Sequence, residues 1–259
     1  MKSITLLIFL LSFSLLAQDE ITTTLQKQDS LKADVFVSKN NFESLYFIKD
    51  NTIIKKEKDQ SYNYSNIQLG NITTVNTFNP LKINVFYADL NTIIILDNRL
   101  AEISKLDFNT SQPYKNISHV TTGFDNTLWL FNQDNQYLEL YDYKTKKTRY
   151  KTIPVASKVL DLTSNYNFCW LLTEHYLYCY NYFGSVVYKV KNDGFLKIKA
   201  SNENVIIQTE NTLIFYNSKS KKLLPIILPN MLISQFSVTN QILYIYNRKL
   251  LYQYQLKTD

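Results

Sequence analysis

Apolar and polar positions alternate along this chain in short runs, and the runs come in pairs separated by a polar turn. Six pairs stand out: "SLYFIKDNTIIKKE", "INVFYADLNTIIIL", "TLWLFNQDNQYLELY", "FCWLLTEHYLYCYN", "NVIIQTENTLIFYN" and "ILYIYNRKLLYQYQ". The runs are rich in Val, Ile, Thr, Tyr and Phe, with Asn, Asp and Ser between them, which is typical of β-hairpins. Beyond the N-terminal segment no stretch has the period of an amphipathic helix, so we expect an all-β protein.

The turns of these hairpins recur at a nearly constant interval. The residues near the turn centres are Asn51, Asn91, Asn135, His175, Asn211 and Arg248. They are successively 40, 44, 40, 36 and 37 residues apart. An interval of roughly 40 residues is that of a four-stranded propeller blade, so the spacing predicts six blades.

Further β-prone runs flank each hairpin. A short apolar run such as "ADVFVS" or "ISHVTTG" precedes it, and a more polar run such as "TRYKTI" or "VVYKVK" follows the first five. The first run of each unit is expected to line the crowded central channel and to be apolar, whereas the last run meets solvent.

The sixth unit lacks its outer run, and the β-prone segment "EITTTLQKQ" precedes the first unit. We therefore expect a six-bladed β-propeller of four-stranded antiparallel blades whose ring is closed by this N-terminal strand. Closure would remove the exposed edges of a linear array. An open β-sandwich or a helix-free solenoid is the alternative.

The first residues, "MKSITLLIFLLSFSLLAQDE", have the features of a secretory signal peptide. Lys2 is positive, residues 4–16 are apolar, and Gln18 rather than a cysteine follows the expected cleavage site, so no lipid anchor is expected. We assign 1–17 to the signal and 18–259 to a single propeller domain, exported to the periplasm, without a transmembrane segment in the mature chain.

Composition changes this interpretation little. The formal net charge is +6, but the basic residues are scattered among acidic ones, which does not favour a nucleic-acid partner. With four glycines and five prolines, the chain must turn mainly on other residues, and Asn best tolerates the left-handed backbone.

Both cysteines lie in one hairpin, "FCWLLTEHYLYCYN". With a two-residue turn, Trp170 faces Cys179 and Cys169 faces Tyr180, so the two thiols point to opposite sides of the sheet. A shift of one residue would place Cys169 opposite Cys179 and permit a cross-strand disulfide. Two strand cysteines and a distant His119 supply too few ligands for a metal site, so none is expected.

Familiar catalytic patterns are missing from the sequence. It has no G-x-S-x-G, no H-E-x-x-H and no glycine-rich phosphate loop. His119 lies in an expected inner strand, and the scattered carboxylates, such as Asp125 and Asp161, are expected at solvated turns or edges. We therefore expect a protein without a cofactor that is not an enzyme.

The chain lacks the signatures of WD, kelch and sialidase propellers. The stretches "DVFVSKNNFESLYFIKDN" and "LWLFNQDNQYLELYDYKT", after a signal ending "LLAQ", are similar to small exported β-propellers of Bacteroidota. That resemblance implies roles such as the periplasmic plug subunit of the type IX secretion translocon. A propeller scaffold of the outer-membrane assembly machinery is another role that it implies.

The leading functional hypothesis is a periplasmic protein-binding propeller that docks on an outer-membrane protein or secretion translocon as an accessory or plug subunit. The hairpin turns of all blades should emerge on one face, which makes their central residues a candidate contact ring. These are Asn51, Asn91, Asn135, His175, Asn211 and Arg248. The alternative is a carbohydrate-binding, hydrolytic or lyase propeller that acts through its central channel.

Overall fold

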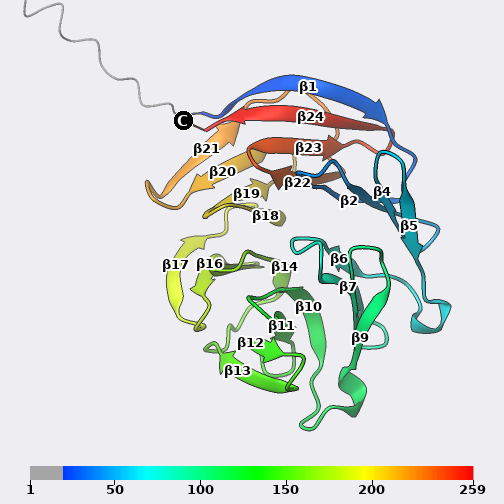
Figure 1. Ribbon diagram of the computed structural model, residues 1–259. Coiled ribbons are helices and arrows are strands. Elements are labelled where there is room, and N and C mark those ends of the chain that lie inside the picture. Colours follow the sequence, from blue (N-terminus) through cyan, green and yellow to red (C-terminus); the bar gives the residue numbers. More distant parts are fainter. Residues whose placement is uncertain (1–19, 259) are drawn as a thin grey trace, which may run out of the picture.

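The computed structural model of the protein describes residues 20–258, so the expected signal segment lies outside the described residues. Six four-stranded antiparallel sheets are arranged as blades around a central channel, as predicted (Figure 1). Helical structure in the described part is confined to two short 3-10 turns, η1 (Ile67–Leu69) and η2 (Phe108–Thr110). None of the described helices could cross a membrane.

The strands of each blade follow the chain from the channel outward. Blade 1 has β2 (Val35–Lys39), β3 (Leu45–Lys49), β4 (Thr52–Lys56) and β5 (Ser61–Tyr64). Blade 2 has β6 (Thr74–Asn76), β7 (Ile83–Tyr87), β8 (Thr92–Leu96) and β9 (Glu102–Asp107). Blade 3 has β10 (Ile117–Thr122), β11 (Thr127–Asn132), β12 (Tyr137–Asp142) and β13 (Lys147–Lys151). Blade 4 has β14 (Val159–Ser164), β15 (Phe168–Thr173), β16 (Tyr176–Asn181) and β17 (Val186–Lys191). Blade 5 has β18 (Lys197–Ser201), β19 (Asn204–Gln208), β20 (Leu213–Asn217) and β21 (Lys222–Ile226). Blade 6 has β22 (Gln235–Thr239), β23 (Ile242–Tyr246), β24 (Leu250–Lys257) and, from the other end of the chain, β1 (Thr22–Ser30).

The N-terminal strand closes the ring, as the sequence predicts. β1 pairs antiparallel with β24 along its whole length and completes blade 6 (blue beside red in Figure 1). The buried Ile21, just before β1, also bridges to Ile226 at the end of blade 5. The hydroxyl of Tyr246, at the end of β23, donates to the backbone carbonyls of Leu31 (3.1 Å) and Ala33 (2.9 Å), which connect β1 to blade 1.

The core lies between the blades, because alternate residues of a strand face opposite neighbours. In β8, Ile94 packs toward blade 1 in a cluster with Tyr46, whereas Ile93 packs toward blade 3 in a cluster with Leu128. A middle strand is therefore covered on both faces. Burial on both faces explains why runs such as "TIIIL" are continuously apolar instead of alternating.

The turns use asparagine in place of glycine at some positions, whereas others have residues such as Asp50, Lys146 and Arg248 in the left-handed region. Asn51, Asn91, Asn202 and Asn240 adopt positive φ values of 55°, 47°, 55° and 47°. Asn is the non-glycine residue that most readily enters this region, so it replaces glycine at these positions.

The cysteine hairpin of blade 4 has the register of a two-residue turn. Trp170 pairs with Cys179 and Cys169 with Tyr180, and both thiols are free and buried. Cys169 packs toward blade 3 beside Trp129, whereas Cys179 belongs to the cluster facing blade 5. The register that would place the cysteines opposite each other is not that of the structure, and no disulfide joins them.

Candidate functional site

The six hairpin-turn residues lie on one side of the ring, which we call the hairpin face. It carries the turns between the second and third strands of every blade and the connections to the next blade. Four of these residues are exposed: Asn135, His175, Asn211 and Arg248. Asn51 is half-buried, and Asn91 is buried.

The two less exposed members of this ring fasten the blades together. The Asn91 amide group donates to the Lys115 carbonyl oxygen (2.6 Å) and accepts from the Ile117 backbone N–H (3.1 Å). Asn51 makes the equivalent pair of bonds, both 2.8 Å, with the chain between β5 and β6. Both side chains thus connect a turn to the strand that enters the next blade, which is a structural role.

The opposite side, the loop face, carries the turns between first and second strands and those between third and fourth strands. Here the central channel opens into a recess of about 380 Å³, the channel recess. It is lined by the ends of β2, β6, β14, β18 and β22 and by the turns that follow all but one of these strands. Five of the six blades therefore contribute to one cavity.

Hydroxyl and amide groups form much of the recess and its base. Ser38 and Thr77 share a hydrogen bond of 2.6 Å between blades 1 and 2. Deeper, Asn76 donates to the Thr121 hydroxyl (2.9 Å), which lies 2.9 Å from the Ser164 hydroxyl. The channel is thus more polar than the expected apolar inner strands. Ser, Thr and Asn side chains stand around the channel opening together with a few apolar residues of the same strands, such as Val37 and Val238.

Two lysines add positive charge to the recess, and no Asp or Glu is among the described residues that line it. Lys39 forms an ion pair with Glu43 and lies 5.9 Å from the centre of the Tyr244 ring. Lys199, in the inner strand of blade 5, is half-buried. Its ammonium group has no ion-pair or hydrogen-bond partner in the described part of the chain.

Two phenylalanines, Phe42 and Phe78, line the recess. Phe42 is 79% exposed at the tip of the first turn of blade 1. Phe78 of blade 2 packs edge-on against Tyr166 of blade 4, with ring centroids 4.8 Å apart. The Phe78–Tyr166 contact connects two blades that are not adjacent in the ring.

A second group of rings, which we call the aromatic patch, joins the loop face to the outer edges of blades 3 and 4. It consists of four aromatic residues, Phe124, Tyr150, Tyr182 and Phe183, together with Arg149. Edge-on contacts connect Phe124 to Tyr182 (5.7 Å) and Phe183 to Tyr150 (5.5 Å). The Arg149 guanidinium lies 5.5 Å from the Phe124 ring centre. Tyr150, Tyr182 and Phe183 are 38%, 40% and 50% exposed.

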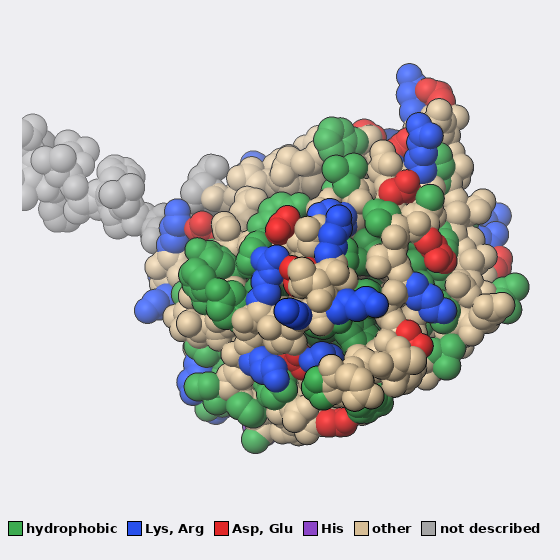
Figure 2. All heavy atoms as spheres, turned by 60° about the horizontal axis from the view of Figure 1, so that its bottom comes forward, with side chains coloured by type: hydrophobic (Ala, Val, Ile, Leu, Met, Phe, Trp, Pro, Cys, Tyr) green, Lys and Arg blue, Asp and Glu red, His purple; other side chains and the backbone are tan. Residues whose placement is uncertain are grey.

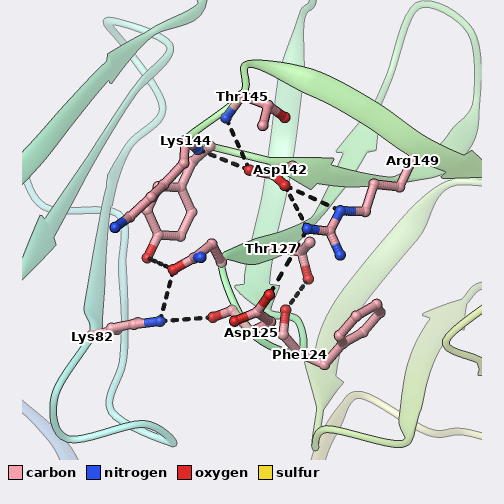
Figure 3. A network of polar contacts seen from close by, with 10 residues as sticks. Lys82, Phe124, Asp125, Thr127, Asp142, Lys144, Thr145 and Arg149 are labelled. Carbon is pink, nitrogen blue, oxygen red and sulfur yellow. Dashed lines mark hydrogen bonds and ion pairs between the residues drawn. The ribbon is translucent and has the colours of Figure 1, made fainter.

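A polar network holds this patch in place (Figure 3). Arg149 donates to an Asp142 carboxylate oxygen through Nη2 (2.6 Å) and Nε (3.1 Å). From blade 2, the Lys82 ammonium donates to the Asp125 carbonyl oxygen and to the Asn126 side chain, both at 2.9 Å. The turn that carries Phe124 is thereby attached to a neighbouring blade.

Two local features support the same network. A Cβ at Gly123 would approach the Thr127 side chain to 2.3 Å, so only glycine permits the tight turn before Phe124. Burial alone would raise the pKa of Asp142, but the backbone N–H of Thr145 and the Arg149 guanidinium lower it below its ordinary value. The Asp142 carboxylate therefore stays ionised and keeps accepting the hydrogen bonds from Arg149.

The outer strands of blades 3 and 4, next to the aromatic patch, carry exposed lysines. β13, at the bottom of Figure 1, exposes Lys147 and Lys151, and β17 beside it exposes Lys189 and Lys191. Figure 2 brings the bottom of Figure 1 forward, and Lys and Arg side chains gather near the middle of that view.

Two groups that could serve acid–base chemistry, His119 and Asp161, lie close enough to interact electrostatically, and each also contacts other groups of the fold. Burial lowers the pKa of His119, and its Nδ1 lies 2.9 Å from the Ser118 hydroxyl. Asp161 accepts hydrogen bonds from the backbone N–H groups of Leu162 and Ile198, each 2.9 Å. Within residues 20–258, no three His, Cys, Asp or Glu side chains are grouped so that they could hold a metal ion.

Sequence comparisons find no match: no family model and no curated protein matches this chain. Many solved structures share its fold. An inactive H270A virginiamycin B lyase from Staphylococcus aureus with quinupristin is 12% identical, with a TM-score of 0.63 over 94% of this chain and 97% of that one. BamB from Moraxella catarrhalis is 8% identical, with a TM-score of 0.51 over 87% and 76%.

PorZ from Porphyromonas gingivalis is a surface component of the type IX secretion system. It is 13% identical, with a TM-score of 0.52 over 85% of this chain but only 32% of its own. At these identities the comparisons show the fold alone, which is that of a β-propeller. Neither the channel recess nor the aromatic patch was evident from the sequence, because both assemble residues from different blades.

Proposed function

We propose that the protein is a non-enzymatic, exported binding module that docks on a protein partner through the aromatic patch. In this proposal the partner is an outer-membrane protein or a secretion translocon, and the propeller is its accessory or plug subunit. The observation that carries it is the exposure of Tyr150, Tyr182 and Phe183 next to Arg149, on a rigid scaffold.

The composition of the patch suits protein recognition. Tyr, Phe and Arg are enriched at protein interfaces, and a few such residues usually supply most of the binding free energy. Exposed rings bury a large apolar area on docking while losing little rotational freedom. The bonds from Lys82 already hold the Phe124 turn, and those to Asp142 hold Arg149, so docking would not have to order these groups.

Charge suggests which partners would be favoured. The exposed lysines of β13 and β17 and the formal net charge of +6 favour an acidic surface and would accelerate the encounter with it. The presence of PorZ among the structures of similar fold supports a role in secretion. The signal-like segment at residues 1–17 supports export.

The hydrogen bonds that already engage the acid–base groups within the fold support a binding role over catalysis. His119 contacts Ser118, and Asp161 is occupied by two backbone N–H groups. A general acid and base would have to converge on one bound substrate. The structural similarity to a lyase therefore carries no catalytic residue over to this chain.

Affinity capture from gently solubilised cell envelopes tests the proposal. Tagged protein should recover one large envelope protein in fixed ratio. The double variant Tyr182→Ala/Phe183→Ala should lose most of that recovery while keeping its melting temperature, because both side chains are exposed. Leu232→Ala, which removes an exposed apolar side chain from the connection leading into blade 6, is the matched control and should capture normally.

The six hairpin-turn residues on the hairpin face remain a competing prediction for the docking site, and Arg248→Glu tests them in the same assay. Loss of capture with Arg248→Glu and not with the aromatic variant would move the docking site to the hairpin face. Wild-type protein that is recovered alone, even after crosslinking, would refute the docking function itself.

A further inference from the structure

The channel recess is a second site, distinct from the aromatic patch, and it has the dimensions of a small-ligand pocket. Its volume of about 380 Å³ lies within the range of about 300 to 1,000 Å³ that ligand sites occupy. Five blades converge on it, so its walls are parts of a rigid ring instead of one mobile loop.

The uncharged polar groups around the recess suit a ligand with many hydroxyls. Serine, threonine and asparagine side chains can donate and accept hydrogen bonds, as sugar hydroxyls do. Ser237 also lines the recess, is 4% exposed, and has a buried hydroxyl without a hydrogen-bond partner in the described structure. Such groups are normally satisfied, so an unsatisfied hydroxyl here indicates capacity for a further partner.

The charges of the recess indicate an anionic ligand. Glu43 already neutralises Lys39, but no described carboxylate is paired with Lys199. The positive charge of Lys199 is therefore available to a negatively charged group that enters the recess. A ligand carboxylate would satisfy it through a charge-assisted hydrogen bond.

The phenylalanine rings of the recess supply the remaining element of sugar recognition. Phe42 is largely exposed, and Phe78 also lines the recess. The electron-rich face of an aromatic ring attracts weakly positive C–H groups, such as those on one side of a pyranose ring.

We propose that the channel recess binds an acidic carbohydrate, a uronic-acid residue at the end of or within a glycan. Its carboxylate pairs with Lys199, its hydroxyls bond to the Ser, Thr and Asn side chains of the inner strands, and one ring face packs on Phe42. This site is independent of the docking function, because it shares no residue with the aromatic patch.

Isothermal titration of the purified protein with digalacturonic acid tests this inference. The wild type should bind it, and Lys199→Gln should weaken binding about tenfold or more, as the loss of a charge-assisted contact does. Lys197→Gln is the matched control, because Lys197 is exposed on the same strand and does not line the recess. Phe42→Ala should weaken binding independently, and its exposed side chain can be removed without harm to the fold.

Three results would overturn the inference. Absence of binding to wild type at millimolar digalacturonic acid would reject the site. Equal binding of the neutral sugar lactose would reject the role of the carboxylate, and equal binding of malonate would reject the role of the hydroxyls. Circular dichroism and melting temperature would confirm that Lys199→Gln is folded; were it not, Phe42→Ala would decide the matter.

Discussion

A buried ion pair between blades 2 and 3 offers a sharp test of the fold energetics. Lys115, in the connection that leads into β10, is 7% exposed, and Glu139 of β12 is fully buried. Their side chains form an ion pair. The Thr148 hydroxyl (2.5 Å) and the Asn132 side-chain amide (3.2 Å) also donate to the Glu139 carboxylate. The substitution Lys115→Met removes the cation while roughly conserving the length and volume of the side chain.

At neutral pH we expect Lys115→Met to lower the free energy of unfolding by about 3–5 kcal/mol, because removing one partner leaves an uncompensated buried charge. For a domain of this size that corresponds to a fall in melting temperature of roughly 6–20 °C. An exposed ion pair would contribute at most about 1 kcal/mol, so burial decides the magnitude.

The pH dependence follows from the pKa of Glu139. Burial alone would raise it, but Lys115, Thr148 and Asn132 lower it below its ordinary value of 4.5. In the wild type the ionised carboxylate therefore contributes stability that is present above about pH 4.5 and is lost as pH falls through the lowered pKa. In Lys115→Met burial is less opposed, so the pKa rises and protonation relieves the cost. The difference between wild type and variant should shrink from pH 7.5 to pH 5.

Urea unfolding followed by tryptophan fluorescence, at pH 7.5 and pH 5, measures both effects. The double variant Lys115→Met/Glu139→Gln, which has no buried charge at this site, should recover part of the loss. The reasoning would be refuted if the free energy of unfolding of Lys115→Met were less than about 1 kcal/mol below that of the wild type. It would also be refuted if the difference between the two proteins were the same at both pH values.

Three further predictions concern single side chains. Tyr246→Phe should lower the free energy of unfolding by about 1–3 kcal/mol, because carbonyl groups of the ring-closing connection lose their donor; an unchanged urea midpoint would contradict this. Burial raises the pKa of Cys169 and raises that of Cys179 to about 12, so neither thiol should react with Ellman's reagent until the protein unfolds. A disulfide-linked peptide in a non-reduced digest would contradict the free thiols. Asn91→Ala should cost about 2–4 kcal/mol in the same unfolding assay, from two lost hydrogen bonds and a positive φ. Asn211→Ala, at an exposed turn, should change stability by less than about 0.5 kcal/mol.

The sequence alone determined the blades, because all of them except blade 6 are made of strands that follow one another in the chain. A hairpin joins strands that are adjacent in the chain. The sequence left two registers open for the cysteine hairpin, and the structure has the one that pairs Trp170 with Cys179. The missing outer strand of the sixth unit also predicted ring closure, since the third strand of that blade would otherwise expose an unpaired edge.

Tertiary structure decided where the candidate sites are. The sequence drew attention to the hairpin turns, yet Asn91 proved to be buried and engaged in joining two blades. Residues such as Phe78 and Tyr166, or Lys39 and Lys199, are brought together only by the circular order of the blades. No short-range pattern records that order, because the residues that meet across the channel are separated by one or more complete blades. The chain therefore specifies its strands locally, whereas the channel recess and the aromatic patch arise only when the ring is closed.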